Sequence, residues 1–115
     1  MINERDENIL LDIITRCKRI IEKNKGISYE EFCLNYDIID IVCFNLIQIG
    51  ELGNKLSLEF KSLHKGEDWK SMIGMKNRMV HGYTSIDFET VFDTMNKDIP
   101  RILDYCLSLT SNKKS

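Results

Sequence analysis

The chain has 115 residues, of which 43% are apolar and 30% charged, and its formal net charge is -2. This length suits one compact domain with one core, and the composition excludes an intrinsically disordered chain. The nearly balanced charge excludes a surface that is basic throughout, so any contact with RNA has to be made by a local patch.

Two helices are predicted in the first third of the chain. The first spans residues 3–24 and ends before Gly26, which can take the left-handed cap conformation. Ser28 and Glu31 have the spacing of a capping box, so a short second helix is predicted over residues 29–35. The apolar residues of the first helix fall on one face: Ile9, Leu10, Ile13, Ile14, Cys17, Ile20 and Ile21.

A long third helix is predicted from residue 38 to about residue 60. Apolar residues cover most of its circumference, and a helix of this kind contacts neighbours on most sides. It is therefore either the central helix of a small bundle or a helix that also forms a subunit interface. Only a narrow strip is polar, and it consists of Asp40, Gln48, Glu51 and Lys55.

After a loop over residues 63–67, a fourth helix is predicted over residues 69–81. Asp68 can cap its start and Gly82 can terminate it. His64 lies in the polar loop sequence LHKGED, where we expect it to be exposed to solvent and assign it no role.

The last part of the chain is predicted to be helical on both sides of a proline. Asp87 can cap one helix, and residues 98–109 are helical again. Pro100 fits either the first turn of a new helix or a kink in one long helix. The sequence thus predicts an all-α, antiparallel bundle of four long helices plus one short helix. A single domain over residues 1–110 forms it, followed by a disordered tail over residues 111–115.

The four cysteines predict buried free thiols in a reducing, cytoplasmic environment. They form no C-x-x-C pair and lie in apolar helical contexts, and the two histidines have no zinc-ligand spacing to them. We expect no metal and no cofactor. We also expect no membrane partner, because the longest apolar run, around residues 38–49, is too interrupted to span a bilayer. The cysteines are Cys17, Cys33, Cys43 and Cys106.

The stretch GMKNRMVHGY joins basic residues, a histidine and a tyrosine at the end of the fourth predicted helix. On an ideal helix Lys76 falls inside the apolar arc, and His81 lies five residues later, about 140° away. Arg78 and His81 share a face, and the helix C-terminus favours the protonated form of His81. The same residues also fit a purely structural interpretation, with a snorkelling Lys76, a solvated Arg78, a capping His81 and an anchoring Tyr83.

A longer stretch, GMKNRMVHGYTSIDFETVFDTMNKDIPRIL, resembles the C-terminal half of the HepT-like branch of the HEPN superfamily. The pattern there is G-M-R-N-x-x-x-H-x-Y, followed by an Asp-led helix and a D-x-P turn. Upstream, IQIGELGNKLS resembles the I-G-E-A helix of the same branch. The resemblance covers roughly residues 1–110.

This resemblance implies a homodimeric helical bundle that acts as a metal-independent endoribonuclease. In such proteins the R-x4-H motifs of two subunits meet in a cleft at the interface. Proteins of this branch are toxins of type VII toxin–antitoxin systems, and their antitoxin partner is a minimal nucleotidyltransferase. It adds AMP to the tyrosine of the H-x-Y element and so silences the toxin.

Carried over residue by residue, His81 takes the place of the catalytic histidine and Tyr83 that of the AMP acceptor. Asn77 takes the place of the motif asparagine, and Lys76 stands where the family has arginine. Lysine keeps the charge but lacks the planar fork that binds phosphate bidentately. Activity could survive in weakened form or be lost, Arg78 could substitute, or the lysine could be an engineered inactivating change.

The residue types suit metal-free cleavage of RNA. A histidine can take the proton of the ribose 2′-hydroxyl or protonate the leaving oxygen, and a cation stabilises charge on the phosphate. A two-fold interface would supply one histidine for each role.

Glu51 and Gln48 either solvate the polar strip of the third helix or line the cleft, where Glu51 would pair with Lys76 or orient His81.

Two other classes of protein remain as alternatives. A catalytically weak or inactive adaptor would keep the dimer and bind only a nucleotidyltransferase partner, and the lysine at position 76 is its best support. A ferritin-like metal-binding bundle is the third, although the chain has no Glu-x-x-His at either histidine.

Overall fold

The structure is a computed structural model that describes residues 2–81 and 87–111, with side chains described over residues 2–75 and 87–110. All regular elements in these ranges are helices, which confirms the all-α prediction. Two helices are long, α1 (Glu4–Asn24) and α3 (Tyr36–Lys55), and α5 (Trp69–His81) is shorter. A fourth rod joins α6 (Phe88–Asp93), the π-helical turn η2 (Thr94–Asp98) and α7 (Ile99–Ser111).

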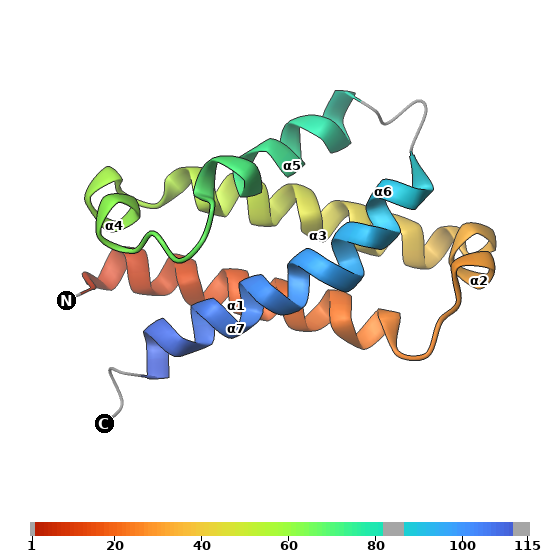
Figure 1. The fold of residues 1–115 in the computed structure, drawn as a ribbon, viewed down its shortest axis with the longest axis horizontal. Coiled ribbons are helices and arrows are strands. Elements are labelled where there is room, and N and C mark those ends of the chain that lie inside the picture. The colour runs from red at the N-terminus through yellow and green to blue at the C-terminus, as the bar shows by residue number, and fades with distance from the viewer. Residues whose placement is uncertain (1, 82–86, 112–115) are drawn as a thin grey trace.

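The four rods run up and down the long axis of the molecule (Figure 1). Helix α1 packs on both α3 and α7, and α5 packs on the other side of α3. The short helix α2 (Tyr29–Leu34) turns the chain from α1 into α3 at one end. The short helix α4 (Leu58–Leu63) turns it from α3 into α5 at the opposite end.

The core lies where the apolar faces of α1, α3 and α7 meet. The predicted face of α1 is confirmed, with Leu10, Ile13 and Cys17 fully buried. Gly26 has a φ of 68°, the left-handed conformation expected after this helix. Ser28 and Glu31 form the predicted capping box of α2.

The third predicted helix is too long. Helix α3 ends at Lys55, Leu56 is extended with φ -61° and ψ 142°, and Ser57 caps the separate helix α4. The break is stabilised from α1, because the buried Asp6 accepts hydrogen bonds from Ser57 N at 3.0 Å and Ser57 Oγ at 2.7 Å. The described residues therefore hold two short helices, α2 and α4, where the sequence predicted one.

His64 is half-buried, which corrects the expectation that it is exposed to solvent. Its ring lies 4.5 Å from that of Phe60, and its carbonyl oxygen accepts a hydrogen bond from Trp69 Nε1 at 2.7 Å. The break that creates α4 folds the loop back on the bundle, and this covers one side of the histidine.

Pro100 lies in the first turn of α7, which follows η2 directly in one continuous rod. Ile99 N donates to Thr94 O, a bond over five residues that widens the turn just before the proline. A wide turn suits this position, because proline has no N–H and its ring clashes with the carbonyl four residues earlier. The predicted tail begins at the last residue of α7, Ser111, and its other residues, 112–115, lie outside the described residues.

Candidate functional site

Helix α5 carries four of the predicted site residues on one continuous stretch of backbone. Lys76, Asn77, Arg78 and His81 all lie in its C-terminal half, and His81 is the last residue of the helix that the structure describes. Their side chains lie outside the described part of the chain, as do Tyr83 and the predicted helix stop at residue 82. Their chemical roles therefore stay predictions.

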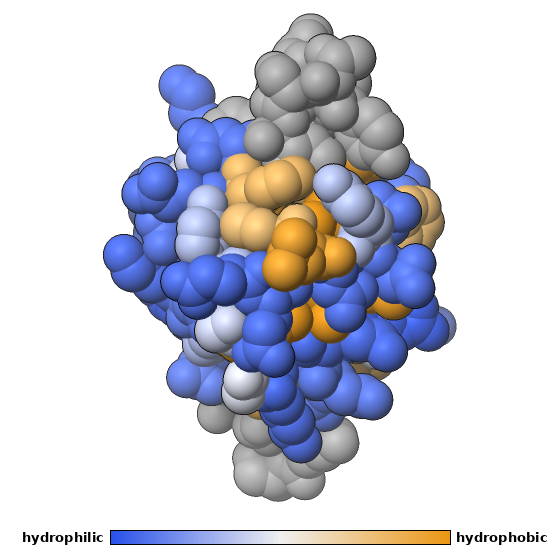
Figure 2. Space-filling view, turned by 90° about the vertical axis from the view of Figure 1, so that its right-hand side faces the viewer, coloured by the Kyte–Doolittle hydropathy of each residue, from blue (hydrophilic) through white to orange (hydrophobic). Residues whose placement is uncertain are grey.

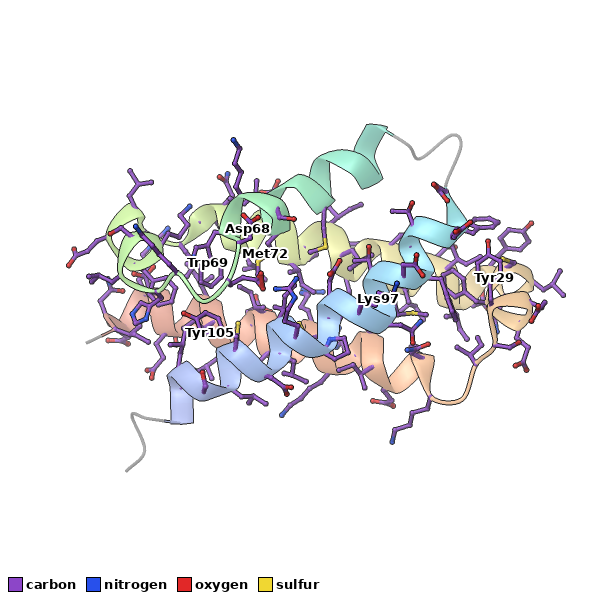
Figure 3. The ribbon with its side chains drawn as sticks, in the orientation of Figure 1. Tyr29, Asp68, Trp69, Met72, Lys97 and Tyr105 are labelled. Atoms are coloured by element: carbon purple, nitrogen blue, oxygen red, sulfur yellow. The ribbon has the colours of Figure 1, made fainter. Side chains whose placement is uncertain are left out.

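The start of α5 is held by its predicted cap and by an aromatic contact. Asp68 Oδ1 accepts a hydrogen bond from Ser71 N at 3.0 Å. Trp69 is buried, and its ring centroid lies 6.1 Å from that of Tyr105 on α7 (Figure 3). Tyr105 Oη also accepts a hydrogen bond from Gly66 N at 3.1 Å, so α7 holds the loop that leads into α5.

A buried carboxylate that the sequence analysis missed also ties this loop to α7. Glu67 forms an ion pair with Arg101, and its Oε1 accepts a hydrogen bond from Asp68 N at 2.8 Å. The hydrogen bonds to Glu67 raise the pKa of Arg101. No local signal marks this pair, because its members lie 34 residues apart. It positions the start of α5 and, through that helix, the candidate site.

Helices α3 and α5 approach closely, and this places the motif beside α3. A Cβ built on Gly53 would lie 2.9 Å from Met72 Sδ, so only glycine fits there without a shift. The two helices run antiparallel (Figure 1). Gln48 lies five residues before Gly53 on α3, and Asn77 lies five residues after Met72 on α5. Because the helices are antiparallel, the backbone positions of Gln48 and Asn77 lie roughly level. The same reasoning sets Glu51 level with Gly74.

Gln48 and Glu51 are both half-buried, on the helix that neighbours the motif. Their placement fits the prediction that they line a cleft beside it. Contact with the motif is untested, because it would involve side chains outside the described part of the chain.

The two faces of α5 differ in what surrounds them. Met72 and Met75 are buried, and the backbone position of Lys76 follows Met72 by about one turn. The opposite face is open, since a Cβ built on Gly74 meets no atom within 4 Å. His81 follows Gly74 by seven residues, about two turns, so its backbone position lies on this open face.

Cys17, Cys43 and Cys106 are not activated nucleophiles. Burial raises the pKa of Cys43 to about 11, that of Cys106 to about 12, and that of Cys17 further still. These three thiols are buried as predicted, whereas Cys33 is only half-buried. Among the described residues, no group of three or more His, Cys, Asp or Glu side chains could hold a metal ion. No helix in the described ranges could cross a bilayer.

The fold and the motif together define a helical bundle whose α5 presents cations and a histidine. The family model described as "Ribonuclease HepT-like" matches residues 10–109, which include all of α5. The chain therefore belongs to the HepT-like ribonuclease family.

Several relatives support this assignment over most of their length. A "Putative RNase" of Caldanaerobacter subterraneus is 31% identical over 90 residues, which are 78% of this chain and 80% of the relative. A "Putative RNase" of Methanocaldococcus jannaschii is 32% identical over 93 residues, 81% of this chain and 85% of the relative. A "Probable ribonuclease HepT" of Thermococcus cleftensis is 28% identical over 96 residues, 84% and 87% of the two chains. No solved structure matches the chain significantly.

Proposed function

We propose that this chain is the toxin of a type VII toxin–antitoxin system and acts as a metal-independent endoribonuclease. The site is built on α5, with His81 as the catalytic histidine and Lys76, Asn77 and Arg78 beside it. The observation that carries the proposal is the match of the ribonuclease family over residues 10–109, which spans the whole motif helix.

The charge of α5 supports an RNA substrate. The helix contains Lys70, Lys76 and Arg78 and no carboxylate, although the whole chain is slightly acidic. The phosphate backbone of RNA is attracted by such a local concentration of cations. The open face at Gly74 leaves room for a ligand along the same helix.

The proposed reaction is transesterification within the RNA. The 2′-oxygen attacks phosphorus while the bond from phosphorus to the 5′-oxygen breaks. One His81 accepts the proton of the 2′-hydroxyl, and His81 of a second copy donates a proton to the 5′-oxygen. Lys76 or Arg78 stabilises the charge on the phosphate. The products carry a 2′,3′-cyclic phosphate and a 5′-hydroxyl.

The outer face of α3 supports a homodimer. Phe44 is 54% exposed there, and Ile41 and Ile47 on the same outer side of the helix are half-buried. Arg16 covers one side of the Phe44 ring, with its guanidinium carbon 5.5 Å from the centroid. Burying this face against a second copy would bring two motif helices into one assembly, as the two-histidine reaction needs.

Silencing follows from chemistry at Tyr83. A minimal nucleotidyltransferase partner would add AMP to its hydroxyl, two residues after His81. The added nucleotide is bulky and negatively charged, so it would block RNA and offset the cations of α5. Under this proposal the unmodified chain is the active form.

RNA cleavage by purified protein in excess EDTA tests the proposal. The intact mass first has to show that Tyr83 carries no nucleotide. We expect cleavage that survives chelation and leaves 2′,3′-cyclic phosphate ends, and we expect His81→Ala to abolish it. Lys18→Ala is the control, because Lys18 is an exposed cation on α1, outside the motif helix; it should retain activity.

Failure of the unmodified wild type to cleave RNA, with the fold intact, would contradict the ribonuclease proposal. Loss of cleavage in EDTA that returns with a divalent metal would contradict the metal-independent mechanism. Cleavage that persists in His81→Ala would remove the histidine from the reaction.

A second candidate function is an inactive adaptor that binds only its nucleotidyltransferase partner. Lys76 favours it, because lysine lacks the bidentate fork of the arginine it replaces in the family pattern. The variant Lys76→Arg separates the two functions. A large rise in cleavage identifies an attenuated enzyme, whereas an unchanged absence of cleavage identifies the adaptor.

A further inference from the structure

The turn from α2 into α3 leaves three large apolar or aromatic side chains exposed in the described part of the chain. We call this surface the α2–α3 corner and define it by Tyr29, Leu34 and Tyr36, which are 39%, 82% and 68% exposed. Figure 2 views this end of the molecule and shows apolar side chains gathered among hydrophilic ones. A shallow hollow at the corner is lined by Glu31, Leu34, Asn35, Tyr36 and Asp37.

The corner is held in shape by local hydrogen bonds and aromatic contacts. The capping box fixes the start of α2, and Asn35 Oδ1 accepts from Ile38 N at 3.1 Å to fix the start of α3. Phe32 is fully buried and packs against Phe92, with ring centroids 5.5 Å apart. The exposed Leu34 therefore sits on a rigid turn, which lowers the entropic cost of binding.

The same end of the molecule is strongly acidic. Residues 25–40 and 87–93 contain seven carboxylates and one lysine, a net charge of -6. Since the whole chain carries -2, the rest of it carries +4. The acidic side chains are Glu30, Glu31, Asp37, Asp40, Asp87, Glu89 and Asp93.

This charge decides what can cover the corner. RNA is repelled by it, and so is the identical corner of a second copy in a two-fold contact. A protein with an apolar pocket surrounded by basic residues is attracted, because its charge complements the rim and its pocket can take up Leu34.

The corner also lies beside the start of α6, which follows Tyr83 closely in the sequence. Helix α2 packs on α6, and Figure 1 shows that α5 ends and α6 begins at this end of the molecule. The pKa of Tyr29 is raised by a hydrogen bond with Cys33, by burial and by the nearby carboxylates of Glu89 and Asp87. Tyr83 precedes Asp87, the N-cap of α6, by four residues in the sequence.

We propose that the α2–α3 corner is the docking surface for the protein that modifies Tyr83, and that this protein inserts an apolar pocket over Leu34 inside a basic rim. The inference rests on the proposed function for the identity of that protein as a nucleotidyltransferase. It adds the surface on which specificity depends, formed by elements other than the motif helix α5.

Two pairs of variants test this surface, because α4 offers matched controls at the far end of the bundle. Leu34→Ser is paired with Leu58→Ser, since Leu58 is 83% exposed on α4, which like α2 has six residues. Glu30→Gln is paired with Glu59→Gln, since both residues are the second of their helix and exposed.

The probe is the minimal nucleotidyltransferase of the source organism that adds AMP to Tyr83 of the wild-type chain from ATP, identified by intact mass and peptide mapping. We expect Leu34→Ser to raise KM for the acceptor chain about tenfold with kcat unchanged. Glu30→Gln should raise KM about twofold, and high salt should weaken the reaction. Both α4 variants should match the wild type.

Each contrary result overturns a distinct part of the inference. An unchanged KM for Leu34→Ser removes the corner as a docking surface while leaving the proposed function intact. A changed oligomeric mass for Leu34→Ser assigns the corner to a contact between copies of this chain. Lost RNA cleavage by the unmodified variant assigns it to RNA binding. If no nucleotidyltransferase labels the wild type, the proposed silencing fails and the docking inference fails with it.

Discussion

Helices α2 and α4 have the same local design but different surroundings. Each has six residues, a serine N-cap and one buried phenylalanine, Phe32 in α2 and Phe60 in α4. Each also exposes a leucine almost completely, Leu34 in α2 and Leu58 in α4. They close opposite ends of the bundle (Figure 1).

The α4 end is tied to the rest of the molecule by long-range polar contacts. Asp6 of α1 binds Ser57, and Glu67 pairs with Arg101 of α7. Trp69 packs on Phe60, with ring centroids 5.6 Å apart. This end of the bundle therefore fixes where α5 begins.

The α2 end has aromatic contacts to α6, but the hydrogen bonds that cap α2 stay within its own turn. The capping box joins Ser28 and Glu31, three residues apart, and outward-facing side chains carry the apolar and acidic groups of the corner. Two short helices with the same local design therefore have different roles. Helix α4 is held by long-range polar contacts, whereas α2 exposes apolar and acidic side chains to solvent. The difference lies in the tertiary partners.

The largest expected effect comes from removing the hydrogen bonds between Asp6 and Ser57 at the start of α4. We expect Asp6→Ala to lower the free energy of unfolding by about 3 kcal/mol, because it leaves Ser57 N and Ser57 Oγ without their acceptor. Urea denaturation followed by far-UV circular dichroism measures the change. Glu4→Ala, an exposed carboxylate in the same helical turn, is the control and should change stability little.

The contribution of Asp6 should depend on pH. Burial acts to raise the pKa of Asp6, but hydrogen bonds from Ser57 and Asn3 outweigh it, so the pKa falls below its usual value of 3.8. A carboxylate whose pKa is lowered in the folded state stabilises the fold at pH values above its unfolded-state pKa. This stabilisation is lost as the pH falls through the folded-state pKa. The stability difference between wild type and Asp6→Ala should thus be constant at neutral pH and shrink below about pH 4. A difference independent of pH in that range would contradict this assignment.

The two capping serines provide the most direct comparison. Ser57→Ala should lower the free energy of unfolding by about 2 kcal/mol, since it removes the cap of α4 and a hydrogen bond to buried Asp6. Ser28→Ala should cost about 1 kcal/mol, because only a local cap is lost. Denaturation of both variants under identical conditions measures the gap, and equal losses would show that the two ends are braced alike.

Two glycines, Gly66 in the loop before α5 and Gly74 in the middle of α5, should respond to alanine substitution with opposite signs. A Cβ on Gly66 would overlap the Tyr105 ring, so Gly66→Ala should destabilise the fold by about 1–2 kcal/mol. A Cβ on Gly74 meets nothing within 4 Å, so Gly74→Ala should stabilise the fold by about 0.5–1 kcal/mol through helix propensity. Thermal melts of the two variants check the signs. Destabilisation by Gly74→Ala would mean that the open face is covered in solution.

The smallest expected effect concerns the exposed leucines. Leu34→Ser and Leu58→Ser should each change the free energy of unfolding by less than about 0.5 kcal/mol, because neither side chain packs in the core. Chemical denaturation checks this, and it also validates both variants for the binding test. A loss of 2 kcal/mol or more in Leu34→Ser alone would reveal packing that α2 does not share with α4.

Where helices begin could be predicted from the sequence wherever the cap is local. Ser28 for α2, Asp68 for α5 and Asp87 for α6 each bond to a backbone N–H three residues later, so the signal lies within one turn. The apolar face of α1 was also predicted, since a period of 3.6 residues shows directly in the sequence.

The candidate site could be predicted only as residues on one helix. The motif residues Lys76 to His81 lie on α5, and Gln48 and Glu51 lie on the neighbouring helix α3, whereas their roles stay predictions. Pairing with Lys76, the second copy and the modification of Tyr83 remain proposals. The exposed α2–α3 corner had no sequence signal, because Leu34 fits the pattern of a buried helix residue as well as that of an exposed one.

The sequence by itself determined the all-α class, the local caps and the place of the motif on α5, because these depend on contacts within a few residues. The tertiary structure decided the break between α3 and α4, the burial of Glu67 and the exposure of Leu34. The first two depend on Asp6 and Arg101, which lie 51 and 34 residues away from their partners. The third depends on which faces the bundle leaves uncovered. Burial and long-range hydrogen bonds arise only when distant segments meet, so local patterns do not contain them.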